Sequence, residues 1–203
     1  MKTLQARGLP KSAQSGFTII ELIVVILLLG ILTATALPRF LDVTDEAHLA
    51  VVNAVQGGLV TGRALFRAQW VATGEPVGTA ITEFNSMQAN SSGNPIGLDA
   101  DADATNALSS NQECADVFVG LLQEGRPSVF TSTEAVNAAI NQTDVDAAGG
   151  EDFIAKLIDN TGPNVCGFAY IGQFSGTSAI ADNAIPLLTY TGSTGAIVRG
   201  TDL

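Results

Sequence analysis

The fold is decided by one stretch of the chain, residues 16–37, which reads GFTIIELIVVILLLGILTATAL. This stretch is almost wholly apolar, and Glu21 is the one charged residue within it. As a helix rising about 1.5 Å per residue, the apolar run would be roughly 30 Å long, the thickness of the hydrocarbon core of a bilayer. Residues 17–38 are therefore predicted to form a helix that can cross a membrane.

The charges on either side of this helix predict its orientation. Residues 1–16 carry basic residues and no acid, whereas acids follow soon after the helix. Because positive charge is retained in the cytoplasm, we expect this leader inside and the rest of the chain outside. The basic residues are Lys2, Arg7 and Lys11, and the acids are Asp42, Asp45 and Glu46.

The composition limits what the exported part can be. A length of 203 residues suits one domain with an appendage, and a hydrophobic content of 46% is enough for a buried core. The chain has 9 Lys and Arg against 20 Asp and Glu, a formal net charge of -11. Nucleic-acid phosphates would repel such a chain, which argues against nucleic acid as its main partner.

Glu21 makes an ordinary signal peptide a poor explanation of the apolar stretch. A carboxylate at bilayer depth costs on the order of 2.5 kcal/mol, so by default it is a functional residue with a partner. A removable signal peptide is nevertheless supported by the basic leader and by the small residues 34–36, after which Leu37 would come first. The stretch is, however, longer than the usual apolar region of about 7–15 residues. A second alternative is that the Glu21 side chain reaches the membrane surface and has no partner.

The motif GFTIIE at residues 16–21, followed by an apolar run with Gly30 and Pro38, resembles the prepilin signature of type IV pilins and type II secretion pseudopilins. The resemblance implies that a prepilin peptidase cuts between Gly16 and Phe17 and methylates the new amino group of Phe17. It also implies that Gly30 and Pro38 serve assembly. Such a subunit lies in the inner membrane before assembly and in an extracellular pilus afterwards.

The same resemblance gives Glu21 a partner. It implies that the carboxylate pairs with the positive N-terminus of a neighbouring subunit, as the pilus assembly machinery joins pilin subunits into a filament. Electrostatics favours this pairing independently, because opposite charges attract more strongly where the dielectric is low, and either charge alone would be buried and unpaired. Glu21 would then set the register of assembly.

Beyond Pro38 the helix is predicted to continue in water as an amphipathic segment, residues 39–72. Small and apolar side chains recur there at spacings of three and four, which predicts one packing face. Gly57, Gly58 and Gly62 weaken the helix and leave two interpretations, close packing against a sheet or a soft point that permits bending. We expect packing at Gly58 and Gly62, and a bend near Pro38. The predicted face comprises Phe40, Val43, Ala47, Val51, Ala54, Gly58, Thr61, Gly62, Leu65 and Gln69.

Residues 73–203 are predicted to form a globular head in which strands linked by hairpins follow the long helix. This order predicts an α+β fold with an antiparallel sheet. The prepilin resemblance implies the same, the type IV pilin fold, with a long N-terminal helix packed on the sheet. We expect short helices at residues 113–124 and 131–140, the second opened by a capping box, and polar or acidic loops at 85–110 and 141–151. Strands are expected at residues 77–84, 153–158, 165–174, 185–191 and 196–199.

The chain has two cysteines, Cys114 and Cys166, both on the side predicted to be exported. In an oxidising compartment we expect them to pair and to stabilise the head by roughly 4 kcal/mol, tying a short helix to a strand. The alternative is two buried free thiols.

Scattered segments of the head are similar to mannose-sensitive haemagglutinin (MSHA) pilins, which carry a cysteine in each of the matching segments around Cys114 and Cys166. This similarity implies a structural subunit, major or minor, of an MSHA-like pilus that serves adhesion, with host or surface glycans as further candidate partners. The similar segments are residues 67–70, 114 with 117–122, 165–170, and 188–192 with 195–198.

Little in the sequence points to catalysis, and we expect neither an enzyme nor a cofactor. His48 is the one histidine, so neither a Ser-His-Asp arrangement nor a zinc site can be built, and we expect it at the surface. Asp99, Asp101 and Asp103 begin like a calcium loop, but the Gly and Glu that such a loop requires are missing, which favours a solvated acidic loop. A second weak calcium candidate comprises Asp144, Asp146, Glu151 and Asp152.

Three functions are compatible with these observations. The first is a structural pilus subunit. The second is a type II secretion pseudopilin, although members of that family often bind calcium in a C-terminal loop and lack the disulfide. The third is a secreted or membrane-tethered binding domain whose N-terminus is an ordinary signal peptide.

Overall fold

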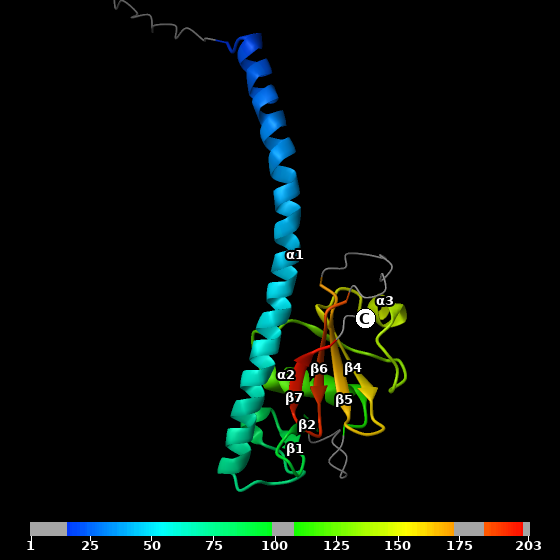
Figure 1. Cartoon of the computed structure of the whole chain (residues 1–203). Coiled ribbons are helices and arrows are strands. Elements are labelled where there is room, and N and C mark those ends of the chain that lie inside the picture. The colour runs from blue at the N-terminus through cyan, green and yellow to red at the C-terminus, as the bar shows by residue number, and fades with distance from the viewer. Residues whose placement is uncertain (1–15, 99–107, 173–184, 201–203) are drawn as a thin grey trace, which may run out of the picture. The chain divides into compact units, whose positions relative to one another are not determined.

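The computed structural model of the chain divides into two compact units, Met1–Asp45 and Glu46–Leu203 (Figure 1). We describe each unit by itself. The residues that the structure describes are 16–98, 108–172 and 185–200, without the side chains of residues 37–45.

Helix α1, Ile19–Ala72, begins in the first unit and continues into the second. Its length of 54 residues confirms the predicted single long helix. The helix is continuous through Pro38, and the bend expected there stays a prediction.

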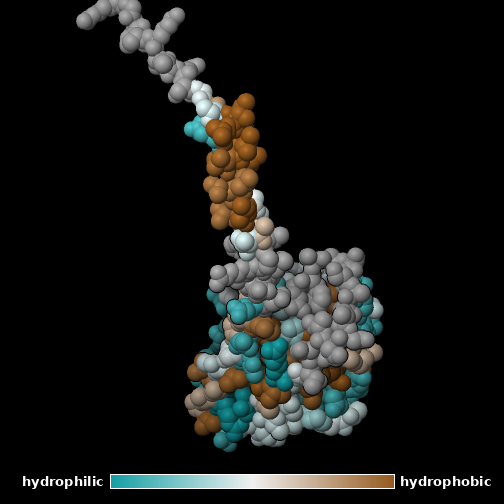
Figure 2. Space-filling model, turned by 45° about the horizontal axis from the view of Figure 1, so that its top comes forward, coloured by the Kyte–Doolittle hydropathy of each residue, from teal (hydrophilic) through white to brown (hydrophobic). Residues whose placement is uncertain are grey.

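In the first unit α1 is apolar on every side. The window Ile19–Ala36 has a mean hydropathy of 2.7, and none of it is buried among the described residues; it is the brown stretch of Figure 2. By length and composition this window can span a membrane. The segment Glu46–Ala72 is also long and apolar enough to span a membrane, with a mean hydropathy of 1.3. It lies in the second unit, however, and part of it is buried there.

In the second unit α1 packs through its large side chains. The predicted packing face is wrong by about one residue, a rotation of roughly 100° around the helix. Leu65, which was expected to pack, is 59% exposed. Because apolar residues surround much of this helix, the spacing alone does not select a face; burying Phe66 and Trp70 removes the most apolar area from water and decides it. The buried face comprises Val52, Val55, Leu59, Gly62, Phe66 and Trp70.

The head is built on a five-stranded sheet with the strand order β3-β4-β5-β6-β7. Strands β3 and β4 are parallel, and the other neighbours are antiparallel, as expected for the predicted α+β fold. Strands β1 and β2 form a separate hairpin. The strands are β1 Met87–Ala89, β2 Pro95–Leu98, β3 Val129–Thr131, β4 Phe153–Asp159, β5 Val165–Tyr170, β6 Leu187–Thr191 and β7 Ala196–Arg199.

Helix α2, Asn111–Leu122, packs on one face of the sheet and confirms the helix predicted at 113–124. A capping box between Ser110 and Glu113 starts it. Phe118 lies at the centre of the main core, with its ring centroid 5.2 Å from those of Phe153 and Phe168.

Helix α3, Gln142–Ala148, covers a second, smaller core cluster. The acidic loop predicted at 141–151 is therefore wrong. The Asn141 side chain caps the helix, and the Asp144 carboxylate accepts the Asn141 N–H at 3.0 Å in return. This capping box uses Asn and Asp where Ser or Thr and Glu or Gln are usual, which is why the sequence pattern concealed the helix.

The helix predicted at 131–140 is also wrong, because backbone N–H groups that such a helix would need donate to carbonyl oxygens of β4 instead. The N–H of Ser132 donates to the Ala155 carbonyl at 3.0 Å, and the N–H of Asn137 donates to the Leu157 carbonyl at 3.0 Å. The segment therefore follows the edge of the sheet after β3.

The strand predicted at 77–84 is replaced by a short 3-10 helix, Thr82–Phe84. Asn85 ends this helix in the left-handed region, with φ 54°. The turn brings Ile81 back to pair with Met87, and hairpin β1–β2 follows inside the segment that was predicted to be only a loop.

Gly58 and Gly62 allow α1 to approach the end of α2, not the sheet. A Cβ atom at Gly62 would collide with the backbone carbonyl of Leu121, and one at Gly58 would lie 2.7 Å from the Leu122 side chain. Close packing was expected at both glycines, but its partner is a helix.

Gly62→Ala is expected to lower the free energy of unfolding by about 1–3 kcal/mol, because the added methyl group meets rigid backbone. Gly57→Ala is the matched control on the same helix, since the space around Gly57 is open. The control should be neutral or stabilise the chain by up to about 1 kcal/mol. Urea denaturation of the detergent-solubilised chain measures both, and equal effects would contradict the close contact.

Candidate functional site

The first turn of α1 holds two residues of the N-terminal motif together. Residues 16–18 are not helical, and Thr18 is the N-cap of the helix. The N–H and the hydroxyl of Thr18 both donate to Oε2 of Glu21, at 2.9 and 2.8 Å. The N–H of Glu21 donates to the Thr18 hydroxyl oxygen at 3.3 Å, so the two residues form a reciprocal capping box.

The capping box supplies the Glu21 carboxylate with hydrogen bonds from its own chain. Such bonds lower the cost of holding a carboxylate near apolar surroundings, but they leave its charge uncompensated. No residue within the described part of the chain forms an ion pair with Glu21. The carboxylate can therefore accept a cation from outside the chain.

Sequence reasoning identified Glu21 but overlooked Thr18. The signal was present, since Thr-x-x-Glu before an apolar run is the capping-box pattern. Phe17 is 86% exposed just before the cap, and a Cβ atom at Gly30 would have no neighbour within 4 Å. The side chain of Pro38 lies outside the described residues.

A second exposed surface lies on the part of α1 that belongs to the second unit, away from the buried face. Its members are all small, and their spacing alternates between three and four residues. That is the heptad spacing of helices that pair in a left-handed coil, and small side chains permit close approach of the partner. This small-residue face comprises Ala47, Ala50, Ala54, Gly57, Thr61, Ala64 and Ala68.

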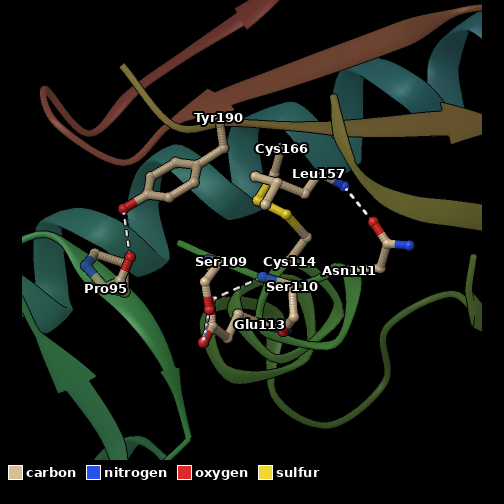
Figure 3. The surroundings of a disulfide bond; sticks show 9 residues. All are labelled: Pro95, Ser109, Ser110, Asn111, Glu113, Cys114, Leu157, Cys166 and Tyr190. Atoms are coloured by element: carbon tan, nitrogen blue, oxygen red, sulfur yellow. Dashed lines mark hydrogen bonds between the residues drawn. A yellow bond between two sulfur atoms is a disulfide. The ribbon is translucent and has the colours of Figure 1, made fainter. Parts of the chain in front are cut away.

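The predicted disulfide is present and joins α2 to β5 (Figure 3). Cys114 and Cys166 are both fully buried, with Cα atoms 5.5 Å apart. Next to Cys114, the Asn111 side chain accepts the Leu157 N–H at 2.9 Å, which holds the start of α2 against β4. The disulfide therefore reinforces a junction that hydrogen bonds also hold.

Tyr190 anchors the hairpin β1–β2 on the other side of the disulfide (Figure 3). Its hydroxyl donates to the Pro95 carbonyl at 2.7 Å. Burial raises the pKa of Tyr190 far above its usual range, so the hydroxyl remains a donor.

The double variant Cys114→Ser/Cys166→Ser is expected to lose roughly 4 kcal/mol of unfolding free energy, because the unfolded chain regains the freedom that the closed loop removes. Urea denaturation under oxidising conditions measures the loss. As a control, the wild-type chain unfolded in reductant should approach the midpoint of the variant. A variant as stable as the oxidised wild type would show that the disulfide is dispensable.

His48, which was expected at the surface, is partly exposed and partly buried. Its Nδ1 lies 2.9 Å from the Tyr170 hydroxyl, a contact that joins α1 to β5 within the second unit. Burial, and then the charge of Asp152, raises the pKa of Tyr170, so its hydroxyl stays protonated and can donate to His48.

The residues that the structure describes give no support for a metal site. The first calcium candidate, Asp99, Asp101 and Asp103, lies outside the described residues. Within 16–98, 108–172 and 185–200, no group of three His, Cys, Asp or Glu could hold a metal ion.

The second calcium candidate is contradicted, because its carboxylates have separate partners. Asp144 pairs with the buried Lys156 at 2.8 Å, and Asp152 accepts hydrogen bonds from Ser128 at 2.9 and 3.0 Å. The remaining members are Asp146 and Glu151.

Comparison with known proteins finds one matching motif and several relatives. Residues 11–37 match the prokaryotic N-terminal methylation motif. The type IV narrow pilus major component PilA5 of Thermus thermophilus is 46% identical over 54 residues, 27% of this chain and 47% of that protein. The fimbrial protein EcpC of Eikenella corrodens is 34% identical over 40% of this chain and 54% of that protein. A fimbrial protein of Dichelobacter nodosus is 29% identical over 74% of this chain and 96% of that protein.

The chain thus spans about half the length of the first two relatives. No solved structure matches the chain.

The long N-terminal helix followed by a largely antiparallel sheet is an α+β fold consistent with that of type IV pilins, and the methylation motif agrees with it. Its N-terminus carries the type IV pilin N-methylation motif, and its relatives are pilins and fimbrial proteins, which are structural subunits and not enzymes. A chain of this class is anchored in the membrane by its apolar helix before assembly and is extracellular, in a pilus, afterwards.

Proposed function

We propose that this chain is the precursor of a structural subunit of an MSHA-like type IV pilus. A prepilin peptidase removes residues 1–16 by cutting between Gly16 and Phe17, and it methylates the new amino group of Phe17. The mature chain is held in the inner membrane by residues 17–38 until the pilus assembly machinery moves it into a filament.

The observation that carries this proposal is the exposed apolar part of α1 with its single carboxylate. An exposed apolar surface of this size needs lipid or other protein to cover it, and the window Ile19–Ala36 has no cover within the described chain. Membrane and filament are the two successive environments of a pilin. A helix that served only as an anchor would have no use for Glu21, whose charge has no cation partner among the described residues.

In the proposed filament, Glu21 of one copy pairs with the Phe17 ammonium of a neighbouring copy. The small-residue face of α1 supports close packing of further helices around it, because small side chains let backbones approach. A head-to-tail contact of this kind repeats without closing, which gives a filament and not a ring.

The head then faces outward and determines what the filament touches. Three of the 9 bases lie in the leader and all 20 acids lie beyond it, so the mature chain is strongly acidic. We assign it a role in adhesion, with surface or host glycans as candidate partners, on the strength of the MSHA-like segments around Cys114 and Cys166.

The test is the N-terminal residue and its mass, determined on protein from a membrane fraction and on material sheared from cells. N-methylated Phe17 in the sheared material is the expected result. The same residue found only in the membrane fraction, without surface filaments, would favour a pseudopilin. A soluble chain that starts at Leu37 would overturn the proposal and leave a secreted domain with an ordinary signal peptide.

A further inference from the structure

The start of α1 determines the conformation of the bond that the proposed peptidase must cut. The first hydrogen bond of the helix runs from the Leu22 N–H to the Thr18 carbonyl, at 3.3 Å. The carbonyl of Gly16, which belongs to the scissile bond, lies before this point in non-helical backbone. The capping box of Thr18 and Glu21 fixes the helix start where it is.

We propose that Thr18 is a positioning residue for cleavage, because its cap keeps the Gly16–Phe17 bond outside the helix. Cleavage is a hydrolysis in which water adds to the Gly16 carbonyl carbon and the C–N bond breaks. Gly16 leaves as a carboxylate and Phe17 as an ammonium. The inference rests on the proposed function, since it assumes that this bond is the one cut.

A free carbonyl matters for this chemistry. In the attack the Gly16 oxygen gains negative charge and must turn toward donors of the enzyme. If the helix began at Gly16, that oxygen would accept the N–H four residues on, from Ile20, and would lie along the helix axis. The enzyme would first have to unwind the turn.

Loss of the cap should extend the helix rather than fray it. Near the membrane an unsatisfied N–H is costly, so the first turn tends to stay hydrogen-bonded. The nearest upstream residues that can serve as N-caps are Gly16 and Ser15. Either choice would place the Gly16 carbonyl inside the helical hydrogen-bond pattern.

The test uses the full-length precursor in detergent micelles with a purified prepilin peptidase, and it measures initial rates of cleavage. Thr18→Val keeps the shape of the side chain but removes its cap, and it should be cut roughly fivefold more slowly. Thr18→Ser and Thr18→Asn keep a capping side chain and should be cut at close to the wild-type rate. Backbone NMR shifts of residues 15–19 should show the helix starting earlier in the Val variant alone.

Three results would overturn the inference: a Val variant cut as fast as wild type, Ser and Asn variants slowed as much as Val, or an unchanged helix start in a slowed Val variant. The second pattern would mean that the enzyme recognises threonine itself. A wild-type precursor that is not cut between Gly16 and Phe17 would instead overturn the proposed function.

Discussion

Glu21→Ala is expected to abolish surface filaments while leaving cleavage after Gly16 largely intact. In the proposed filament the variant leaves the Phe17 ammonium of the neighbouring copy without its partner. Removing one member of a buried charge pair costs about 3–5 kcal/mol, and here the loss recurs at every subunit. Cleavage should persist because Thr18 keeps its hydroxyl and can still cap the helix. Immunoblots of sheared material and of the membrane fraction measure assembly and processing separately.

Glu21→Gln separates the charge of Glu21 from its role in the capping box. Glutamine has nearly the same shape and retains a carbonyl oxygen that can accept from Thr18, but it carries no charge. If charge pairing drives assembly, the Gln variant should fail as the Ala variant does. Normal filaments from the Gln variant would mean that Glu21 acts only through the capping box. Normal filaments from the Ala variant would contradict the proposed function.

The N-terminal part of the molecule could be predicted because its signals are local. An apolar run long enough for a bilayer, a basic leader and one acid in the first turn are all read directly from residues 16–37. The same locality explains the success at 113–124, where the helix pattern and the capping box agree, and at the C-terminal strands.

The head could be predicted only in part, because several of its elements depend on partners distant in sequence. Residues 131–140 have a helix-like start, but β4 takes their backbone donors. The buried face of α1 was misjudged because Phe66, and not Leu65, packs in the head, where its ring centroid lies 5.3 Å from that of Phe84. The His48 contact with Tyr170 joins residues 122 positions apart in the sequence, and no local pattern predicts it.

The burial of Lys156 likewise depends on residues distant in sequence and could not be predicted. Lys156 lies in the predicted strand at 153–158, but nothing local shows that its ammonium group is buried. In the structure both Lys156 and Asp144 are 0% exposed, with Nζ and Oδ2 2.8 Å apart. The carboxylate also accepts a hydrogen bond from the Ser132 hydroxyl at 2.5 Å. Removing either charge from such a buried pair leaves the other charge buried without a partner, which destabilises the fold.

Lys156→Met is expected to lower the free energy of unfolding by about 3–5 kcal/mol, because it leaves the Asp144 carboxylate buried without a cation. Urea denaturation of the detergent-solubilised chain measures the loss. Methionine is close to lysine in length and apolar, so the variant changes the charge far more than the packing.

The double variant Lys156→Met/Asp144→Asn distinguishes an unpaired charge from a packing defect. Ser132 and the N–H of Asn141 donate to different oxygens of Asp144. An asparagine oxygen in the place of Oδ2 can accept from the N–H of Asn141, and its amide group can donate to the Ser132 hydroxyl oxygen, so the cap of α3 survives while the buried charge disappears. The double variant should therefore recover most of the stability lost in Lys156→Met. If both variants are equally unstable, the loss comes from the shape of the methionine side chain, and the ion pair contributes little. Recovery would mean that the pair is needed mainly because each charge requires the other, since two well-matched neutral groups can fill the same space.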